Sequence, residues 1–253
     1  MSKKKDEVVY FDEKGKRFDG RSQFEIRPIT LKVGVIERSD GSAYVEWGQN
    51  KAIAAVYGPR EMLPKHLADA NKATIRYYYR MAPFSVPDRK NPKPGRREIE
   101  ISKVSGEALS HSVDLEQYPN TAIDIFVTIF DSNAGTRITA LLAASLALAD
   151  AGLPMKDLVS GIAVGKAGGK LIADMNKHEE DASDAVDLPI AMLPNNNDIV
   201  LLQMDGVLTE KEFYECLDIA KKNCQEIREL QVSALKEKYS VDFNSGDWND
   251  ARI

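Results

Sequence analysis

Cysteine and histidine, which most often form disulfides or hold transition metals, are scarce in this sequence. Only two cysteines and three histidines occur among 253 residues. Cys216 and Cys224 lie within one helical pattern, and the histidines stand far apart, at positions 66, 111 and 178. This scarcity argues against a disulfide-stabilised secreted scaffold and against a zinc site. We therefore expect a reduced, cytoplasmic protein with both cysteines in its core.

Long apolar runs and the common catalytic motifs are also missing. No apolar stretch reaches the length of a membrane span, and the basic start leads into polar sequence rather than a signal-peptide core, so we expect no membrane partner. There is no CxxC, HExxH or GxSxG, and GIAVGKAGGK lacks the spacing of a phosphate-binding P-loop. Any chemistry must then rest on carboxylates, arginines and a bound ion.

The charge is acidic overall but unevenly distributed. The net charge is −5, yet residues 59–97 contain ten lysines and arginines against three acids, a local charge of +7. Such a basic stripe on an acidic body is typical of a site for a polyanion. The alternative is a solvated loop with scattered charge, and composition alone does not separate the two.

Hydrophobic periodicity and turn residues predict an α+β fold. We expect three strands within 26–60, further strands at 73–84, 121–130, 186–193 and 198–205, and a hairpin at 161–174. Helices are expected at 98–115, at 136–151 and after the capping-box pair Thr209 and Glu212. The proline-containing stretch 85–98 should be a loop. Strands followed by a helix, twice over, indicate two similar halves.

The stretch Asn133-Ala134-Gly135 follows a predicted strand and precedes Thr136-Arg137 at a predicted helix start. Backbone N–H groups at a helix start, a hydroxyl and a guanidinium together suit an anion. The alternative is that Arg137 pairs with a nearby carboxylate and Thr136 only caps the helix.

Five acidic residues precede the predicted strand at 186–193: Glu179, Glu180, Asp181, Asp184 and Asp187. Asp181 and Asp187 are six positions apart and would share one face if this segment were a strand. Carboxylates there suit magnesium, which is often shared with phosphate, and one acid is a candidate to protonate a leaving oxygen. Together with the anion site, they predict phosphoryl transfer.

Several short stretches taken together resemble the RNase PH family, and within it the catalytic subunits of archaeal exosomes. They include DGR (19–21), AAVYGPRE (54–61), RREIEISK (96–103), AGTR (134–137) and DLPIAM (187–192). The resemblance implies the RNase PH fold. Its two halves are expected at 19–153 and 154–239, between an N-terminal extension (1–18) and a disordered tail (240–253).

The resemblance also implies a reaction and its residues. The expected reaction is phosphorolytic 3′-to-5′ degradation of single-stranded RNA, with inorganic phosphate as co-substrate, magnesium as cofactor and nucleoside diphosphates as products. The implied phosphate-binding residues are Gly135, Thr136, Arg137 and Arg97. Those implied to bind RNA are Lys65, Arg96 and Arg97. Those implied to act in catalysis and to hold magnesium are Asp181 and Asp187.

The implied partners are an inactive RNase PH-like paralogue, in a hexameric ring of three heterodimers, and RNA-binding cap proteins. Two alternatives remain: a bacterial-type RNase PH that trims tRNA 3′ ends, and a catalytically silent ring subunit that only binds RNA. The retained aspartates and Gly-Thr-Arg element argue against a silent subunit. Two departures from similar sequences concern metal binding: Asn133 replaces an aspartate, and Asp184 is an additional acid able to compete for the ion.

Overall fold

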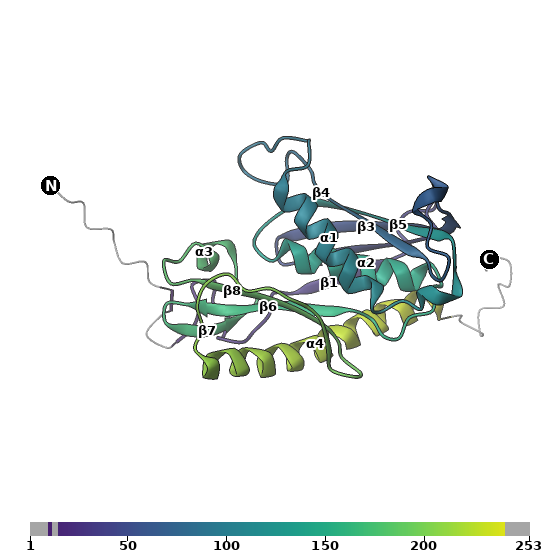
Figure 1. The fold of residues 1–253 in the computed structure, drawn as a ribbon. Helices are drawn as coiled ribbons and strands as arrows, with labels where there is room; N and C mark the ends of the chain where they lie inside the picture. The colour runs from purple at the N-terminus through teal and green to yellow at the C-terminus, as the bar shows by residue number, and fades with distance from the viewer. Residues whose placement is uncertain (1–9, 12–14, 241–253) are drawn as a thin grey trace.

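The computed structural model describes residues 10–11 and 15–240, and it confirms the predicted α+β fold (Figure 1). Apart from Ser240, the predicted disordered tail lies outside these residues, as does most of the predicted N-terminal extension. Two β-sheets are separated by helix α2 (Thr136–Asp150), and the long helix α4 (Glu210–Tyr239) runs along the underside of the molecule (Figure 1).

The first half contains a five-stranded sheet with the strand order β1-β2-β3-β5-β4. Its strands are β1 (Ile29–Val33), β2 (Gly41–Trp47), β3 (Asn50–Glu61), β4 (Thr74–Met81) and β5 (Thr121–Asp131). All neighbours pair antiparallel except β4 and β5, which are parallel. A parallel pair requires a crossover, and α1 (Arg96–Ser110) supplies it. Two short 3₁₀ helices, η1 (Lys65–Leu67) and η2 (Leu115–Gln117), complete this half.

The second half contains a four-stranded antiparallel sheet with the order β7-β6-β8-β9. Its strands are β6 (Ser160–Ala167), β7 (Lys170–Ala173), β8 (Val186–Leu193) and β9 (Asp198–Leu202). The hairpin predicted at 161–174 is confirmed, and Gly168 and Gly169 at its turn both have positive φ, which glycine adopts readily. A one-turn helix, α3 (Lys177–Glu180), precedes β8.

Helix α2 is the centre of the core. Twelve of its fifteen residues are buried, because it packs against β2, β3 and β5 on one side and against β6 and β8 on the other. A helix that is apolar on all sides must be enclosed in this way. Its small residues let both sheets approach closely, so the helix start is held rigidly between the two halves.

Helix α4 begins as predicted. The Thr209 hydroxyl accepts the Glu212 N–H, and the Glu212 carboxylate accepts the Thr209 N–H. Cys216 and Cys224 lie on its buried face, which confirms their predicted place in the core. Burial raises the pKa of the Cys216 thiol to about 11 and that of Cys224 to about 12, so both remain protonated.

One local prediction is wrong. Arg96 and Arg97 lie in the first turn of α1, not in the preceding loop, because the Glu98 carboxylate accepts the Gly95 N–H and starts the helix there. Arg17, within the expected N-terminal extension, is 2% exposed and donates from Nε to Glu179 Oε1 (2.6 Å).

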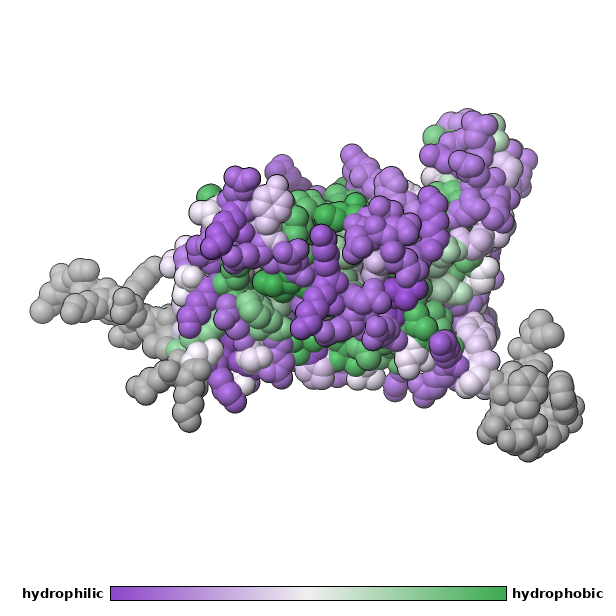
Figure 2. Space-filling model, turned by 90° about the horizontal axis from the view of Figure 1, so that it is seen from below, coloured by the Kyte–Doolittle hydropathy of each residue, from purple (hydrophilic) through white to green (hydrophobic). Residues whose placement is uncertain are grey.

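The underside, along which α4 lies, is mostly hydrophilic with separate hydrophobic patches (Figure 2). None of the helices within residues 10–11 and 15–240 is both long and apolar enough to cross a bilayer.

The close approach of β2 to α2 yields a prediction about stability. A Cβ atom at Gly41 would lie 2.3 Å from the Ala147 carbonyl oxygen and 2.3 Å from the Ala151 nitrogen. Gly41→Ala should therefore lower the free energy of unfolding by about 1–3 kcal/mol, the usual cost of overpacking. Denaturant unfolding of the purified chain measures it, and an unchanged midpoint would contradict this contact.

Candidate active site

A cavity of about 260 Å³ lies where the two halves meet. It is lined by Arg97, Arg137, Glu180, Asp187, Pro189, Gln203, Met204 and Asp205. The two arginines come from α1 and α2 of the first half, and the acids come from the second half. The cavity thus brings arginines of one half together with carboxylates of the other, and Asp187 lines it whereas Asp181 does not.

A second cavity of about 220 Å³ shares Arg97 and Glu180 with the first. Ala134 and Thr136, at the start of α2, line it, and so does Lys90 of the proline-containing loop. Lys90 is ion-paired with the buried Glu98, which ties this loop to the first turn of α1. Arg97 and Glu180 therefore contribute to both cavities.

Arg137 pairs with a nearby carboxylate, as one of the alternatives drawn from the sequence expects. Its Nη2 pairs with Glu100 Oε2 at 3.3 Å, and its Nη1 donates to the Gln203 side chain. Gln203 in turn donates from Nε2 to Glu100 Oε1 at 2.7 Å, which holds the guanidinium in place. The Nε of Arg137 is buried and makes no hydrogen bond within the described part of the chain. An anion in the cavity is a partner of the right charge for this donor.

The start of α2 has the backbone that the sequence predicts. Gly135 is the N-cap residue with φ of 71°, and Thr136 is the first helical residue. Thr136 does not cap the helix with its side chain, so that alternative is wrong. Instead its Oγ1 accepts the Tyr79 hydroxyl at 3.0 Å, and the residue lines the second cavity.

Asp187 is the second residue of β8 and is held by two backbone hydrogen bonds to Asp205, of 2.9 and 2.8 Å. Burial and the nearby Glu180 raise the pKa of the Asp187 carboxyl to about 6, with a smaller contribution from Asp205. Arg137 and Arg97 oppose this rise. The cavity thus contains a carboxyl that changes charge near neutral pH, a property common at catalytic sites.

Asp181 and Asp187 do not share a strand face, which corrects that expectation. Asp181 ends α3, is exposed, and pairs with Lys177 Nζ at 2.8 Å. Its neighbour Glu180 is the acid of this turn that lines both cavities. The helical turn arises because the Asn176 side chain accepts the Glu179 N–H and caps α3.

The other two acids of the run have structural partners. Glu179 is buried against Arg17, and its Oε2 accepts the Asn176 N–H at 2.9 Å. Asp184 accepts the N–H groups of Gly168 (3.1 Å) and Gly169 (2.7 Å), and so stabilises the β6–β7 turn. In this structure Asp184 is engaged at that turn and does not line the cavity, contrary to the expectation that it competes for an ion.

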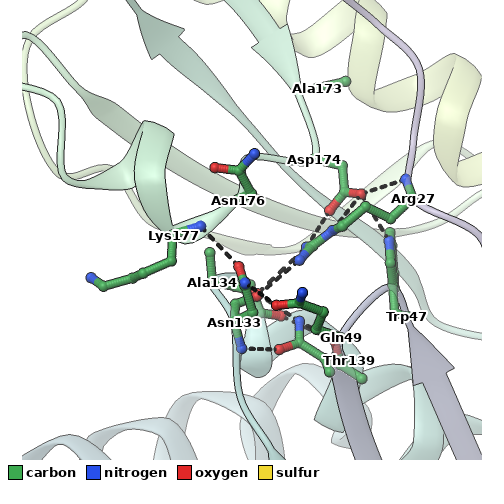
Figure 3. Close-up of polar contacts among 12 residues, drawn as sticks. Arg27, Trp47, Gln49, Asn133, Ala134, Thr139, Ala173, Asp174, Asn176 and Lys177 are labelled. Atoms are coloured by element: carbon green, nitrogen blue, oxygen red, sulfur yellow. Dashed lines mark hydrogen bonds and ion pairs between the residues drawn. The ribbon is translucent and has the colours of Figure 1, made fainter. Parts of the chain in front are cut away.

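Asn133 and Ala134, at the bend before α2, are held by side chains of both halves (Figure 3). Asn133 Oδ1 accepts the Lys177 N–H at 2.9 Å, so Asn133 joins this bend to α3 and does not contact Arg137. The backbone carbonyl of Asn133 accepts Arg27 Nη1 at 2.9 Å. Arg27 is paired through Nη2 with the buried Asp174 at 2.6 Å.

Comparison with known proteins decides the family. Residues 25–154 match domain 1 of the 3′ exoribonuclease family, and residues 157–223 match domain 2. The chain belongs to the RNase PH family of 3′ exoribonucleases. The recognition made from short motifs is confirmed, as is a 3′-to-5′ exoribonuclease in general terms.

Similar curated proteins span nearly the whole chain. The Exosome complex component Rrp41 of Thermococcus onnurineus is 52% identical over 239 residues, which are 94% of this chain and 96% of that protein. The protein of the same name from Nitrosopumilus maritimus is 49% identical over 240 residues, 95% of this chain and 97% of that one.

Two solved structures share the fold, each at 24% sequence identity. Rice (Oryza sativa) Rrp46 has a TM-score of 0.78, with 87% of this chain and 100% of the other aligned. A chain of the Archaeoglobus fulgidus exosome with RNA bound to the active site has a TM-score of 0.75, with coverages of 86% and 93%. Both confirm the RNase PH fold.

Of the RNA-binding residues implied by the RNase PH resemblance, Arg97 lines both cavities, whereas Arg96 is exposed and lines neither. Lys65 opens η1 and pairs with Glu61 at 2.7 Å on the surface. The eight residues of β4 separate η1 from the loop that leads to α1, a span of roughly 26 Å. Lys65 and Arg97 therefore lie on opposite sides of β4, and two further basic residues of the stripe, Arg76 and Arg80, lie within this strand.

Several residues of the cavity were not singled out from the sequence. Glu180 was noted only as part of the acidic run, and Gln203 and Asp205 only within the predicted strand at 198–205. Glu100 was noted only within the stretch RREIEISK, because its role depends on α1 passing Arg137. A magnesium ion has suitable oxygen donors in Asp187, Glu180 and Asp205. Within residues 10–11 and 15–240, however, no three His, Cys, Asp or Glu side chains form a ready-made cation site.

The raised pKa of Asp187 predicts how stability depends on pH without divalent cations. The folded chain keeps this proton up to about pH 6, whereas the unfolded chain loses it near pH 4, so ionisation destabilises the fold progressively between these values. Asp187→Asn should therefore raise the melting temperature above pH 6 and have little effect below pH 4. Thermal unfolding across this range tests it, with the exposed Asp198→Asn as control. Equal effects at both ends would contradict the raised pKa.

Proposed function

We propose that this chain is the catalytic subunit of an exosome and degrades RNA from the 3′ end by phosphorolysis, releasing nucleoside diphosphates. The names of the relatives support the assembly. The site supports the chemistry through one observation above all. The buried, unpartnered Nε of Arg137 lies in a side chain that lines the same cavity as the Asp187 carboxyl.

The proposed phosphate is bound by Arg137 and Arg97, with Thr136 and the N–H groups at the start of α2 as further donors. These donors stabilise the negative charge of the phosphate and hold its attacking oxygen in position. A phosphate oxygen attacks the terminal phosphorus of the RNA, and the bond from that phosphorus to the 3′ oxygen of the preceding nucleotide breaks. The 3′ oxygen leaves with a proton, and the terminal nucleotide departs as a nucleoside diphosphate.

Magnesium is the proposed cofactor, held by Asp187 together with phosphate oxygens and water. Magnesium commonly binds proteins through only one or two carboxylates and completes its coordination with substrate oxygens and water. When bound, the ion would neutralise charge on the phosphoryl oxygens. Asp187 must be ionised to hold it, so binding should weaken as the pH falls through about 6.

Single-stranded RNA is the proposed substrate, with Arg96 and Arg97 at its 3′ end and Lys65 farther along the strand. Lys65 and the two arginines of α1 suit an extended strand of RNA because β4 lies between them. The proposed partners are an inactive paralogue, which alternates with this chain in a ring of three heterodimers, and RNA-binding caps. In that ring Lys65 and the arginines would face the passage, and the isolated chain should have weak activity.

The role of Arg137 can be tested by phosphate titration. Arg137→Ala should raise the phosphate concentration needed for half-maximal degradation at least tenfold, since a charge-assisted hydrogen bond contributes about 1.5–3 kcal/mol. The products are separated to distinguish nucleoside diphosphates from monophosphates, using the chain alone and with its paralogue.

Arg228→Ala is the matched control, because Arg228 pairs with Asp157 and lines neither cavity. Its phosphate requirement should equal that of the unmodified protein. Phosphate-independent release of monophosphates would rule out phosphorolysis. An unchanged phosphate requirement in Arg137→Ala would show only that Arg137 does not bind the phosphate.

The proton for the leaving 3′ oxygen is assigned to Asp181, with its neighbour Glu180 as the rival. Asp181→Asn should reduce turnover at least 10²-fold, as losing a general acid does, and leave RNA affinity nearly unchanged. Degradation and the reverse addition of nucleotides should fall together, because both cross one transition state. Both rates are measured for Asp181→Asn and Glu180→Gln at several magnesium concentrations. A near-normal rate for Asp181→Asn together with a large loss for Glu180→Gln would move the role to Glu180.

A further inference from the structure

Side chains donate hydrogen bonds to the backbone carbonyl groups of the bend before α2. The Asn133 carbonyl accepts Arg27 Nη1 at 2.9 Å, and the Ala134 carbonyl accepts Asn50 Nδ2 at 2.6 Å. Arg27 Nη2 also reaches the Ala134 carbonyl, at 3.5 Å. Two successive peptide groups therefore turn their oxygens toward these side chains (Figure 3).

These hydrogen bonds determine where the backbone N–H groups of Ala134 and Gly135 point. In a trans peptide the C=O and N–H bonds lie on opposite sides. Because the oxygens of residues 133 and 134 face Arg27 and Asn50, the N–H groups of Ala134 and Gly135 face away from them. Ala134 lines the second cavity, and both residues have positive φ, of 35° and 71°. Successive N–H groups in such turns form a concave anion site.

Arg27 can hold the bend only if its own guanidinium is fixed, and Asp174 fixes it. The Asp174 carboxylate accepts the backbone N–H of Arg27 (2.7 Å), its Nε (2.9 Å) and its Nη2 (2.6 Å). Trp47 Nε1 donates to the same carboxylate at 3.0 Å, and Arg21 Nη1 lies 3.2 Å from it. Asp174 is 2% exposed, so these partners satisfy its charge in place of water.

We propose that Asp174 and Arg27 are positioning residues for the phosphate site. Asp174 follows β7 in the second half and orients Arg27. Arg27 then sets the peptide planes of Asn133 and Ala134 so that their opposite sides present N–H groups to phosphate. Neither residue lines the two cavities that hold the proposed reaction, and the inference rests on the proposed phosphorolysis.

Steady-state kinetics of the assembled complex test this role, with phosphate and RNA varied separately. Arg27→Lys keeps the positive charge beside Asp174. It removes the planar guanidinium group, whose nitrogens donate both to the Asp174 carboxylate and to the carbonyl groups of the bend. Asp174→Asn keeps the shape of the side chain and removes its charge. Both should raise the KM for phosphate on the order of tenfold, the lower end of what losing an outer partner costs at metal sites. The KM for RNA should stay within about twofold, since the RNA-binding residues do not depend on this bend.

Trp47→Phe is the matched control, because it removes one hydrogen bond to Asp174 without changing Arg27. It should lower the melting temperature and leave the phosphate KM unchanged. If Asp174→Asn does not fold, Arg27→Lys alone decides. A normal phosphate KM in Arg27→Lys, with a raised one in Arg137→Ala, would overturn the positioning role and leave phosphorolysis intact. Equal rises in both KM values would also overturn it, by showing a general loss of structure. An unmodified complex that needs no phosphate would overturn phosphorolysis itself.

Discussion

The burial of α2 between two sheets is the constraint on which the site depends. Apolar and small side chains surround this helix on all sides, so it cannot rotate or slide without opening the core. Its first residues emerge where the halves meet, and Arg137 lines one cavity together with Glu180 and Asp187. Gly135, Thr136 and Arg137 are therefore held in a fixed position, although they follow an irregular bend. This rigidity suits an anion site whose donors must be arranged before the ligand binds.

The cavity combines opposite charges that partly compensate each other. Arg97 and Arg137 oppose the effect that burial and Glu180 have on Asp187, and the resulting pKa of about 6 leaves the carboxyl near its titration point. Phosphate and a cation together would add charges of both signs to such a site. The arginines would then contact the anion and Asp187 the cation, which reduces the cost of burying each charge.

The hydrogen bonds among the two halves make the site depend on both of them. Asp174 belongs to the second half, yet through Arg27 it holds a bend of the first. Asn133 provides a second link, because its side chain accepts the N–H that begins α3. An amide suits position 133, because Asn133 accepts this N–H from Lys177 and donates to Gln49 (2.5 Å) at once.

Much of the fold was predictable because its signals are local. Periodicity located most strands, turn glycines located the β6–β7 hairpin, and Thr209 with Glu212 located the start of α4. The motif around Arg137 was also recognisable, since its residues are adjacent in the chain. Tertiary structure alone decided the rest: Asn176 capped a helical turn at Glu180, which separated Asp181 from the strand face of Asp187. Glu100, Asp174 and Arg27 act on residues distant in sequence, and only the packing of α1, α2 and both sheets brings such partners together.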